Sequence, residues 1–265
     1  MVADKIKPVI YAPFAHYLES GGVSLPQCCE RMVGDGPDVE SVVSIGGDGT
    51  FLQASRWLAG REAAILGVNT GHLGYLASFS LDHIGRICDA LRGHRCRRER
   101  RKTLELSCEG MPTDVWPYAL NEVAVLKADT ALMVWVKARL DESYLADFQG
   151  DGLIISTPTG STGYNLSAGG PLVEPKARLI MLTPICPHTL NQRSIILSPE
   201  DVIEIGIPAG RGGFSQTLEA NFDGSHVIKL NTGDRVRIVE SEKITEFIKL
   251  NKVSFLEVLN QKMRE

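Results

Sequence analysis

The sequence predicts a two-part fold: an α/β N-terminal domain with a parallel, Rossmann-like sheet, followed by a mainly β C-terminal domain. Short apolar runs alternate with helix-like segments up to about residue 95. Beyond residue 102, apolar and polar residues alternate with period two in many short segments, and a helical pattern returns at the end. We expect the final helix to return to the first domain, so that the domains cover residues 1–100 with 250–265, and 101–249.

The elements of the first part follow from short apolar runs and from helical spacing. The predicted strands cover residues 9–12, 42–45 and 64–68, and the predicted helices cover residues 51–58 and 81–91. In the second helix apolar residues recur every three or four positions, which places them on one face. Strands and helices that alternate in this way are typical of a parallel sheet.

The elements of the second part are strands with period-two alternation. They cover residues 103–108, 121–126, 132–140, 202–207, 217–222 and 235–239. Many strands with little helix predict a mainly β domain. The last predicted element is the helix over residues 254–263, which has apolar residues at helical spacing.

Composition and charge bound the class of protein. The chain has 265 residues, 43% of them hydrophobic and 23% charged, with a net charge of −4 that gives no support to nucleic-acid binding. No apolar run is long enough for a membrane span, and the six cysteines form no CxxC pair. We expect a cytoplasmic protein with reduced thiols, without nucleic-acid or membrane partners, and we interpret the basic stretch 92–102 as a solvated domain junction.

The most informative motif is Gly-Gly-Asp-Gly-Thr at residues 46–50, between a predicted strand and a predicted helix. Glycines lack Cβ bulk, and the start of a helix offers N–H donors and a positive dipole end, so a phosphate can approach closely. An acid in a phosphate site suits a proton acceptor for an attacking hydroxyl, or a metal-linked arrangement. The alternative is a tight turn in which Asp48 caps the helix.

A second constellation covers residues 150–170, where a glycine-flanked acid, Asp151, leads through a short strand into a loop rich in small hydroxyl residues. Such a loop can surround a flat, polar ligand such as a nucleotide. A third feature is the pair Asn121 and Glu122 at the start of a strand pattern. This pair can bind ribose hydroxyls, with Asn donating and Glu accepting, or it can mark an exposed edge.

These motifs together resemble the NAD kinase family, which phosphorylates the 2′-hydroxyl of the adenosine ribose of NAD to give NADP. The resemblance extends over nearly the whole chain. It rests on residues 46–50, 67–76, 121–122, 150–170 and 182–188. The pentapeptide alone is shared with lipid kinases of the diacylglycerol type and with phosphofructokinases, whereas the run Thr-Pro-Thr-Gly-Ser-Thr at residues 157–162 is far more specific.

The resemblance implies a role for each matched residue. Asp48 is expected to take the proton from the 2′-hydroxyl, with Gly49 beside the ribose and the phosphates. Tyr75 and Leu76 are expected to line the adenine region, while Asn121 and Glu122 bind adenosine. Asp151 is expected to contact the nicotinamide half, in this family often across a subunit interface. The rest of the dinucleotide pocket is expected to consist of Thr159, Thr162, Gly163, Tyr164, Asn165 and Ser167.

The family also implies a phosphoryl donor, a metal ion and an assembly. The donor is ATP or polyphosphate, and a divalent ion, Mg²⁺, is expected to bridge its phosphates without a dedicated carboxylate site. Homodimers or homotetramers are common in the family. The chain lacks the G-x-x-x-x-G-K-[ST] pattern of P-loop kinases. It also has Gln149 where many members have Arg or Lys, and Gln cannot neutralise a negative charge.

Two alternative functions remain at this stage, a lipid or sugar kinase of the wider superfamily and an NAD(P)-binding regulator without turnover. The first explains residues 46–50 but not residues 150–170, and the presence of Asp48 argues against the second. Asp223 is a further open case. It begins an Asp-Gly pair that turn chemistry alone explains, and a second acid in the pocket is the alternative.

Overall fold

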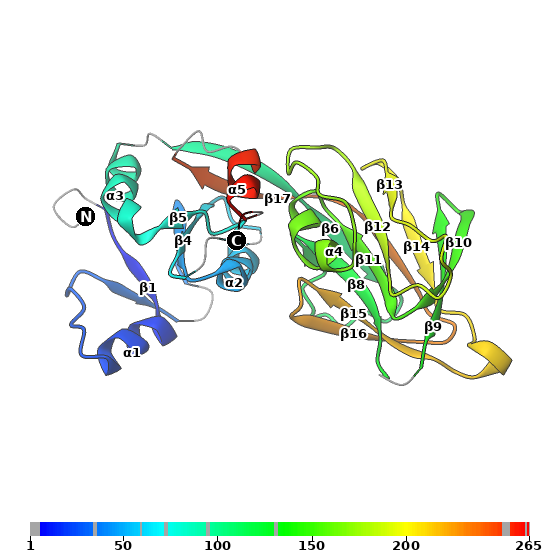
Figure 1. Cartoon of the computed structure of the whole chain (residues 1–265). Helices are drawn as coiled ribbons and strands as arrows, with labels where there is room; N and C mark the ends of the chain where they lie inside the picture. Colours follow the sequence, from blue (N-terminus) through cyan, green and yellow to red (C-terminus); the bar gives the residue numbers. More distant parts are fainter. Residues whose placement is uncertain are drawn as a thin grey trace. The chain divides into compact units, whose positions relative to one another are not determined.

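The chain divides into two compact units, one formed by residues 1–99 with 246–265 and the other by residues 100–245. The computed structural model describes residues 6–33, 36–58, 60–71, 74–93, 96–129, 132–250, 255–262 and 264. Figure 1 shows the order of the elements along the chain. None of the helices in these ranges is both long and apolar enough to cross a membrane.

The first unit contains the parallel sheet that the sequence predicts. Strand β4 (Ala64–Asn69) pairs in parallel with β3 (Ser41–Ile45), with β5 (Phe79–Ser80) and with the end of β17. A separate parallel pair is formed by β1 (Val9–Tyr11) and β2 (Glu30–Met32). All six residues of β4 are buried, as expected for a strand with neighbours on both sides and cover on both faces.

Two helices of the first unit differ from the prediction: one was not predicted, and another begins earlier than predicted. The helices of this unit are α1 (Ala12–Ser20), α2 (Asp48–Leu58), the 3₁₀ turn η2 (Leu81–His83), α3 (Ile84–Arg92) and α5 (Phe255–Lys262). The sequence reading extends the first strand to Ala12 and misses α1, which has proline in its first turn, a favoured position. Helix α2 begins at Asp48, so the acid of the glycine turn is its first residue. Ser254 and Met263, the ends of the predicted final helix, lie outside the described residues.

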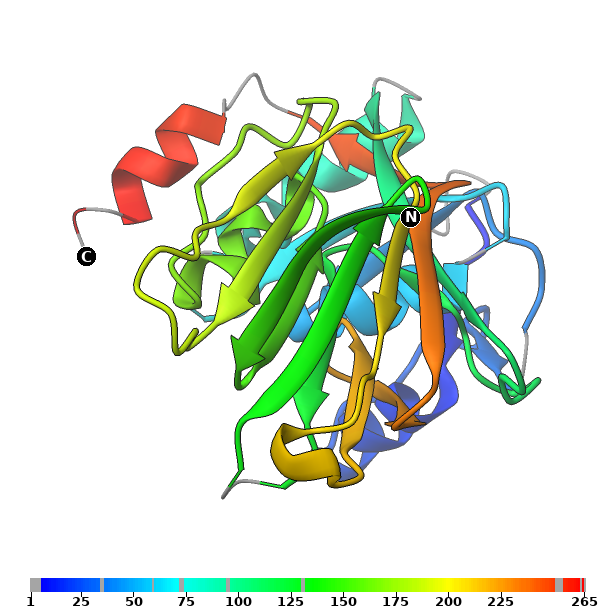
Figure 2. The same ribbon diagram turned by 90° about the vertical axis from the view of Figure 1, so that its right-hand side faces the viewer.

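The second unit is built from antiparallel strands. One sheet has the order β13-β12-β11-β8-β15-β16, and in the other β10, β9, β14 and β17 are neighbours in that order, with β6 pairing β17 and β7. The strands are β6 (Arg97–Cys108), β7 (Tyr118–Ala119), β8 (Glu122–Lys127), β9 (Val134–Leu140), β10 (Ser143–Gly150), β11 (Gly152–Ser156), β12 (Ile180–Ile185), β13 (Ile195–Leu197), β14 (Ile203–Gly206), β15 (Thr217–Phe222), β16 (His226–Asn231) and β17 (Arg235–Lys249). The green and yellow strands of this unit run side by side in Figure 2.

A large apolar cluster forms the main core of the second unit, and a smaller one contains Ala124, Ile154 and Ile185. The large cluster takes residues from both sheets, among them Val123 and Val125 of β8, Phe148 of β10 and Ile203 of β14. Burial alternates with period two in β14 and β15, as the sequence pattern predicts, whereas β11 and β12 are buried on both faces. The predicted fold class, an α/β part followed by a mainly β part with a final helix, is confirmed.

The segment after β11 is more ordered than the predicted loop. It forms the 3₁₀ turn η3 (Thr159–Thr162) and the short helix α4 (Tyr164–Ser167), in which Thr159, Gly160, Ser161 and Asn165 are buried. A further 3₁₀ turn, η4 (Arg211–Gly213), lies between β14 and β15. The hydroxyl-rich run thus forms packed turns rather than an open surface loop, because its small residues fit against the sheet.

Candidate functional site

The carboxylate of Asp48 is held by three consecutive backbone N–H groups. Its Oδ2 accepts a hydrogen bond from Tyr75 N–H at 2.9 Å, and its Oδ1 accepts from Leu76 N–H at 3.1 Å and Ala77 N–H at 3.0 Å. The acid at the start of α2 is therefore joined to the segment that follows β4. This arrangement fixes the direction of the carboxylate, which a simple helix cap would not do.

Two glycines permit this arrangement. Gly46 follows β3 and has φ of +153°, and its N–H donates to the Val68 carbonyl at 2.9 Å. A Cβ at Gly74 would overlap Oδ1 of Asp48, so only glycine allows the segment 74–77 to approach the carboxylate so closely. By contrast, a Cβ at Gly49 would meet no atom within 4 Å, so packing within the protein does not require glycine there.

The carboxylate keeps one acceptor position. A carboxylate offers about four lone-pair directions, and three of those of Asp48 are used by Tyr75, Leu76 and Ala77. Because Oδ2 accepts one of these three bonds and Oδ1 accepts two, the remaining direction belongs to Oδ2. The arrangement can therefore accept a proton or a hydrogen bond from a hydroxyl placed beside Oδ2.

Of the residues that hold Asp48, Tyr75 lies near the surface and Leu76 lies in the interior of the first unit. Tyr75 is partly exposed, and burial together with the charge of Asp48 raises the pKa of its hydroxyl. Leu76 is 6% exposed, so its side chain belongs largely to the interior of the first unit while its N–H holds Asp48. His72 and Leu73, in the middle of the matched motif 67–76, lie outside the described residues.

Two lysines from the C-terminal segment border the same stretch, and sequence reasoning missed both. Lys249 Nζ donates to Ser78 Oγ at 3.3 Å, and Lys262 Nζ lies 6.0 Å from the centre of the Tyr75 ring. They bring positive charge to residues 75–78, which suits a site that binds phosphates. No sequence signal links them to Asp48, because they come from the end of the chain.

In the second unit, Asn121 and Glu122 form a buried polar pair at the start of β8. They are 8% and 7% exposed. Among the described residues, Asn121 Oδ1 and Glu122 Oε2 have no hydrogen-bond partner. Buried acceptors without donors are costly and uncommon, so a bound molecule that supplies hydroxyl or amine donors would satisfy them.

Burial, and then the nearby charge of Asp223, raise the pKa of Glu122 to about 8, although a hydrogen bond from the backbone N–H of Tyr164 partly opposes this rise. Desolvation and a like charge both disfavour the ionised carboxylate. The pKa of the Tyr164 hydroxyl is also raised, by burial and by the charges of Cys186, Asp151 and Glu122. Glu122 is therefore neutral over much of the physiological pH range.

The turns after β11 pack directly on this pair. A Cβ at Gly160 would overlap the carbonyl oxygen of Asn121, and a Cβ at Gly163 would lie 3.0 Å from Oε2 of Glu122. Thr159 is buried, and Thr162 Oγ1 donates to the Thr159 carbonyl at 3.5 Å. The structure therefore brings the turn residues of η3 and Tyr164 to Asn121 and Glu122, as a common binding site requires.

Other predicted pocket residues lie in different surroundings. Asn165 is fully buried; its Nδ2 donates to the Pro171 carbonyl at 3.1 Å and its Oδ1 accepts from Thr183 Oγ1 at 2.7 Å. Its side chain thus holds the turn from within. Ser167 is exposed, and Asp151 forms an ion pair with Lys127 at 2.6 Å. Direct contact of these three residues with a dinucleotide stays a prediction.

The hydrogen bonds of Asp223 bear on a question that the sequence left open, whether this acid only shapes a turn. Its carboxylate accepts backbone N–H bonds from Leu120 at 2.8 Å, Asn121 at 2.8 Å and Glu122 at 3.0 Å. Asp223 is thus more than a turn residue, since its side chain holds the start of β8. Two hydroxyls also hold this segment: Thr157 Oγ1 donates to the Leu120 carbonyl at 2.7 Å, and Ser156 Oγ donates to that of Asn121 at 3.3 Å.

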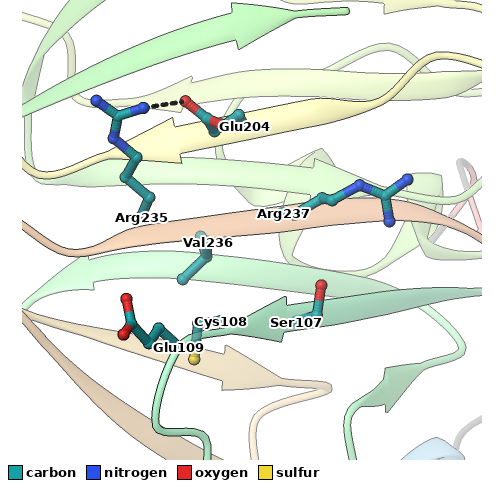
Figure 3. Close-up of a pocket in the computed structure, with 7 residues that line it drawn as sticks. All are labelled: Ser107, Cys108, Glu109, Glu204, Arg235, Val236 and Arg237. Atoms are coloured by element: carbon teal, nitrogen blue, oxygen red, sulfur yellow. Dashed lines mark hydrogen bonds and ion pairs between the residues drawn. The ribbon is translucent and has the colours of Figure 1, made fainter. Parts of the chain in front are cut away.

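A shallow pocket on the second unit contains none of the predicted site residues. Its volume is about 360 Å³, and Figure 3 shows its lining of Ser107, Cys108, Glu109, Glu204, Arg235, Val236 and Arg237. Glu204 is paired with Arg235 at 3.3 Å and with Arg139 at 3.8 Å. The pairing compensates its charge, and the pocket offers no buried acceptor comparable to Glu122.

Comparison with known proteins identifies the family. The model of the ATP-NAD kinase N-terminal domain matches residues 32–95, and that of the ATP-NAD kinase C-terminal domain matches residues 120–250. An NAD kinase from Lachnospira eligens is 39% identical over 237 residues, which is 85% of this chain and 80% of that protein. The chain belongs to the NAD kinase family. An NAD kinase from Geobacter metallireducens is 36% identical over 98% of this chain and 88% of that protein.

Solved structures support the same assignment. An NAD kinase from Archaeoglobus fulgidus in complex with ATP has a TM-score of 0.74 at 29% identity and covers 97% of this chain and 98% of its own. Yeast NADH kinase complexed with NADH has a TM-score of 0.85 at 21% identity over 98% of this chain and 79% of its own, which shows a shared fold. The predicted family and enzyme class are confirmed: the chain is an NAD kinase, rather than a lipid kinase of the wider superfamily.

The raised pKa of Glu122 predicts a pH-dependent stability. Burial and Asp223 raise the pKa of Glu122 from its ordinary value of 4.5 to about 8 in the folded state. The stabilising protonation is therefore complete below pH 4.5 and is lost as pH rises toward 8. Relative to Glu122→Gln, the wild type should lose roughly 1.4 kcal/mol per pH unit in this window. Urea unfolding from pH 5 to pH 9 measures the difference.

The control for this experiment is Glu219→Gln on β15, a partly exposed position with the same change of side chain. It should follow the wild type at every pH. Parallel stability curves for the wild type and Glu122→Gln would show that Glu122 titrates normally and would contradict the electrostatic description of the pair.

Gly74→Ala is predicted to displace the Asp48 carboxylate, because the added Cβ would overlap it. A misplacement of about 1 Å in a catalytic group lowers turnover by about 10²-fold. The kcat for NAD phosphorylation measures the effect. Gly85→Ala in α3 is the matched control, since its Cβ would meet no atom within 4 Å, and it should keep wild-type turnover. Equal activity of the two variants would argue against the fixed carboxylate.

Proposed function

We propose that Asp48 is the general base of NAD phosphorylation. It takes the proton of the 2′-hydroxyl of the adenosine ribose while the oxygen of that hydroxyl attacks the terminal phosphorus of the donor. The bond from phosphorus to the bridging oxygen of the donor breaks, and its electron pair stays with the departing nucleotide or polyphosphate. The products are NADP and the shortened donor.

One observation carries this proposal: the Asp48 carboxylate is held by three N–H groups and keeps an acceptor direction on Oδ2. A general base must reach the proton it abstracts in a defined geometry, and a carboxylate fixed on one side and open on the other supports that role. Phosphoryl transfer depends mainly on positioning and on charge stabilisation, so orientation contributes directly to rate.

The surroundings of Asp48 also suit the donor phosphates. The glycine turn 46–50 and the start of α2 offer backbone N–H groups and a positive dipole end. Lys249 and Lys262 add positive charge beside residues 75–78. These features support a phosphate site in the first unit that does not need the lysine of a P-loop.

A divalent ion, Mg²⁺, is part of the proposal. Over the described ranges, no group of three or more His, Cys, Asp or Glu side chains could hold a metal ion by itself. Mg²⁺ commonly binds through substrate phosphates, so the donor phosphates would hold the ion while the open acceptor direction of Asp48 Oδ2 stays with the 2′-hydroxyl. When bound, the ion would neutralise charge on the donor phosphates.

The dinucleotide is proposed to bind through the second unit. Asn121 and Glu122 bind the adenosine ribose through their unpartnered oxygens. The 3₁₀ turn η3 and the short helix α4 surround the ribose with backbone groups and the Tyr164 ring. Asp151 contacts the nicotinamide half of NAD, and its carboxylate is at the same time paired with Lys127. That ion pair supplies a cation near the position where Gln149 provides none.

Four finer points belong to the proposal: a donor that is ATP or polyphosphate, an acceptor that is NAD or NADH, assembly as a homodimer or homotetramer, and a cytoplasmic location. A related NAD kinase was solved with ATP, and the yeast NADH kinase was solved with NADH. These neighbours make ATP the first donor to test and NADH the first alternative acceptor.

Asp48→Asn should lower kcat for NAD phosphorylation by at least about 10²-fold, because the amide cannot accept the proton. NAD affinity, measured by calorimetry, should stay within a few fold of wild type. Asp82→Asn, which changes another acid of the first unit in η2, should leave both quantities unchanged. Near-normal turnover of Asp48→Asn would remove this residue from the proton transfer.

A panel of donors and acceptors tests the metal and the substrates. With ATP and NAD, removal of divalent ions by EDTA should abolish NADP formation, and added Mg²⁺ should restore it, because the phosphate charge is then neutralised. The same assay is repeated with polyphosphate as donor and with NADH as acceptor. Full activity in EDTA would contradict the metal requirement, and absence of product with every donor would contradict the proposed reaction.

A further inference from the structure

Asp223 stands out because its carboxylate holds the backbone of the whole polar pair. It accepts the N–H groups of Leu120, Asn121 and Glu122 at 2.8, 2.8 and 3.0 Å, and its own N–H donates to the Glu122 carbonyl at 3.1 Å. Hydrogen bonds therefore run in both directions between the β15–β16 turn and the first residues of β8. The position from which the Asn121 and Glu122 side chains project depends on this turn.

The turn is shaped to present this carboxylate. Asp223 has φ of +46° and Gly224 has φ of +72°, and Ser225 N–H donates to the Phe222 carbonyl at 3.1 Å. Asp, Asn and Gly tolerate this left-handed region better than other residues. Turn chemistry accounts for the Asp-Gly pair, but it does not account for three hydrogen bonds to residues about a hundred positions earlier in the chain.

Asp223 also acts on Glu122 through charge. Of the described groups that act on Glu122, Asp223 faces it from the β15–β16 turn and Tyr164 faces it from the start of α4. Asp151 and Cys186 act on the Tyr164 hydroxyl in turn. Burial and Asp223 raise the pKa of Glu122, while the backbone N–H of Tyr164 lowers it. The charge of Asp223 thus works against ionisation of the acceptor that the ribose needs.

We infer that Asp223 is a positioning residue of the dinucleotide site, which orients Asn121 and Glu122 through their backbone and couples ribose binding to pH through its charge. The inference rests on the proposed role of Asn121 and Glu122 in binding NAD. In this proposal Asp223 acts on the substrate through Asn121 and Glu122 rather than by direct contact. Its effect reaches the dinucleotide through the unpartnered oxygens of the pair.

The sign of the pH effect follows from the hydrogen bonds. A ribose hydroxyl that donates to Oε2 of Glu122 favours the ionised carboxylate, so NAD binds better as Glu122 loses its proton. Because the pKa of free Glu122 is about 8, the KM for NAD should fall as pH rises toward 8 and then level off. Without the charge of Asp223, the same fall should occur at lower pH.

Asp223→Asn separates charge from backbone geometry, since Asn tolerates a positive φ and keeps one acceptor oxygen. We expect the fall in KM for NAD to move to lower pH by about one unit, because the like charge is gone. We also expect the KM plateau above the fall to rise about tenfold, because all three bonds lose their charge assistance and at least one loses its acceptor oxygen. The KM for ATP should not change.

Asp223→Glu is the complementary variant, since it keeps the charge but moves the carboxylate by one methylene group. Its KM plateau for NAD should rise, while the pH of the fall should stay close to that of the wild type. Asp234→Asn is the matched control: Asp234 also accepts a turn N–H, that of Asn231 at 2.7 Å, at the other end of β16. It should change neither the plateau nor the pH of the fall.

A ligand-free measurement keeps this inference distinct from the proposed function. Urea unfolding of each Asp223 variant, with and without Glu122→Gln, gives the pH at which Glu122 titrates in the absence of NAD. An unchanged titration in Asp223→Asn would overturn the charge coupling. If Asp223→Asn does not fold, an unchanged KM plateau in folded Asp223→Glu would overturn the positioning role.

The proposed function fails on different grounds. If Glu122→Gln leaves the KM for NAD and its pH dependence unchanged, Glu122 does not bind the ribose. The ligand-free titration would then still show whether Asp223 controls the proton of Glu122. The two results together assign any failure either to the role of the pair in binding or to the role of Asp223 in positioning it.

Discussion

A carboxylate that accepts three consecutive backbone N–H groups is the interaction on which the candidate site residues of each unit depend. Asp48 holds residues 75–77 in this way, and Asp223 holds residues 120–122. Backbone N–H groups outside a sheet or helix need partners, and hydrogen bonds to a charged acceptor contribute about 1.5–3 kcal/mol each. One side chain in each unit thus orders a whole segment, and the segment in turn fixes the direction of the carboxylate.

The close approach of these segments explains why glycine stands beside the functional side chains. A Cβ at Gly74 would overlap Asp48, and a Cβ at Gly160 would overlap the backbone of Asn121. In both places the glycine serves contacts within the protein. A glycine-rich motif near a phosphate site therefore has two separate causes, access for the ligand and access for the neighbouring chain segment. Within residues 46–50, Gly47 and Gly49 are free of the second, because a Cβ there would meet no atom within 4 Å.

In the second unit, the buried pair Asn121 and Glu122 costs the folded protein stability instead of stabilising it. Glu122 is buried next to Asp223, and both burial and charge oppose its ionisation. A folded protein gains nothing from leaving Asn121 Oδ1 and Glu122 Oε2 without donors. Such an arrangement is understandable when a ligand completes the hydrogen bonds, and this is why the pair points to the acceptor substrate more directly than the open pocket in Figure 3 does.

The amino-acid sequence determined the features that depend on neighbouring residues. Periodicity predicted the parallel strands around residues 42–45 and 64–68 and the antiparallel strands of the second unit, because burial of one face imposes a local pattern. It missed β10, β13 and β16, and it missed β12, where Pro184 argues against a strand. The structure explains the exception: β13 pairs only with Ile180–Leu182, so β12 has no partner on that edge at Pro184 to receive the missing N–H.

Only the tertiary structure decided the features that join distant parts of the chain. The sequence placed Asp48 at the end of a strand and recognised Asn121 and Glu122 through a family resemblance, yet it could not show that residues 75–77 hold the first or that Asp223 holds the other two. The identity of a residue does not show which acceptor its backbone N–H group will bind. Side-chain identity and spacing are set locally, whereas hydrogen bonds across about a hundred residues exist only once the strands have paired. The same holds for the proton affinity of Glu122, which burial and the nearby charge of Asp223 set.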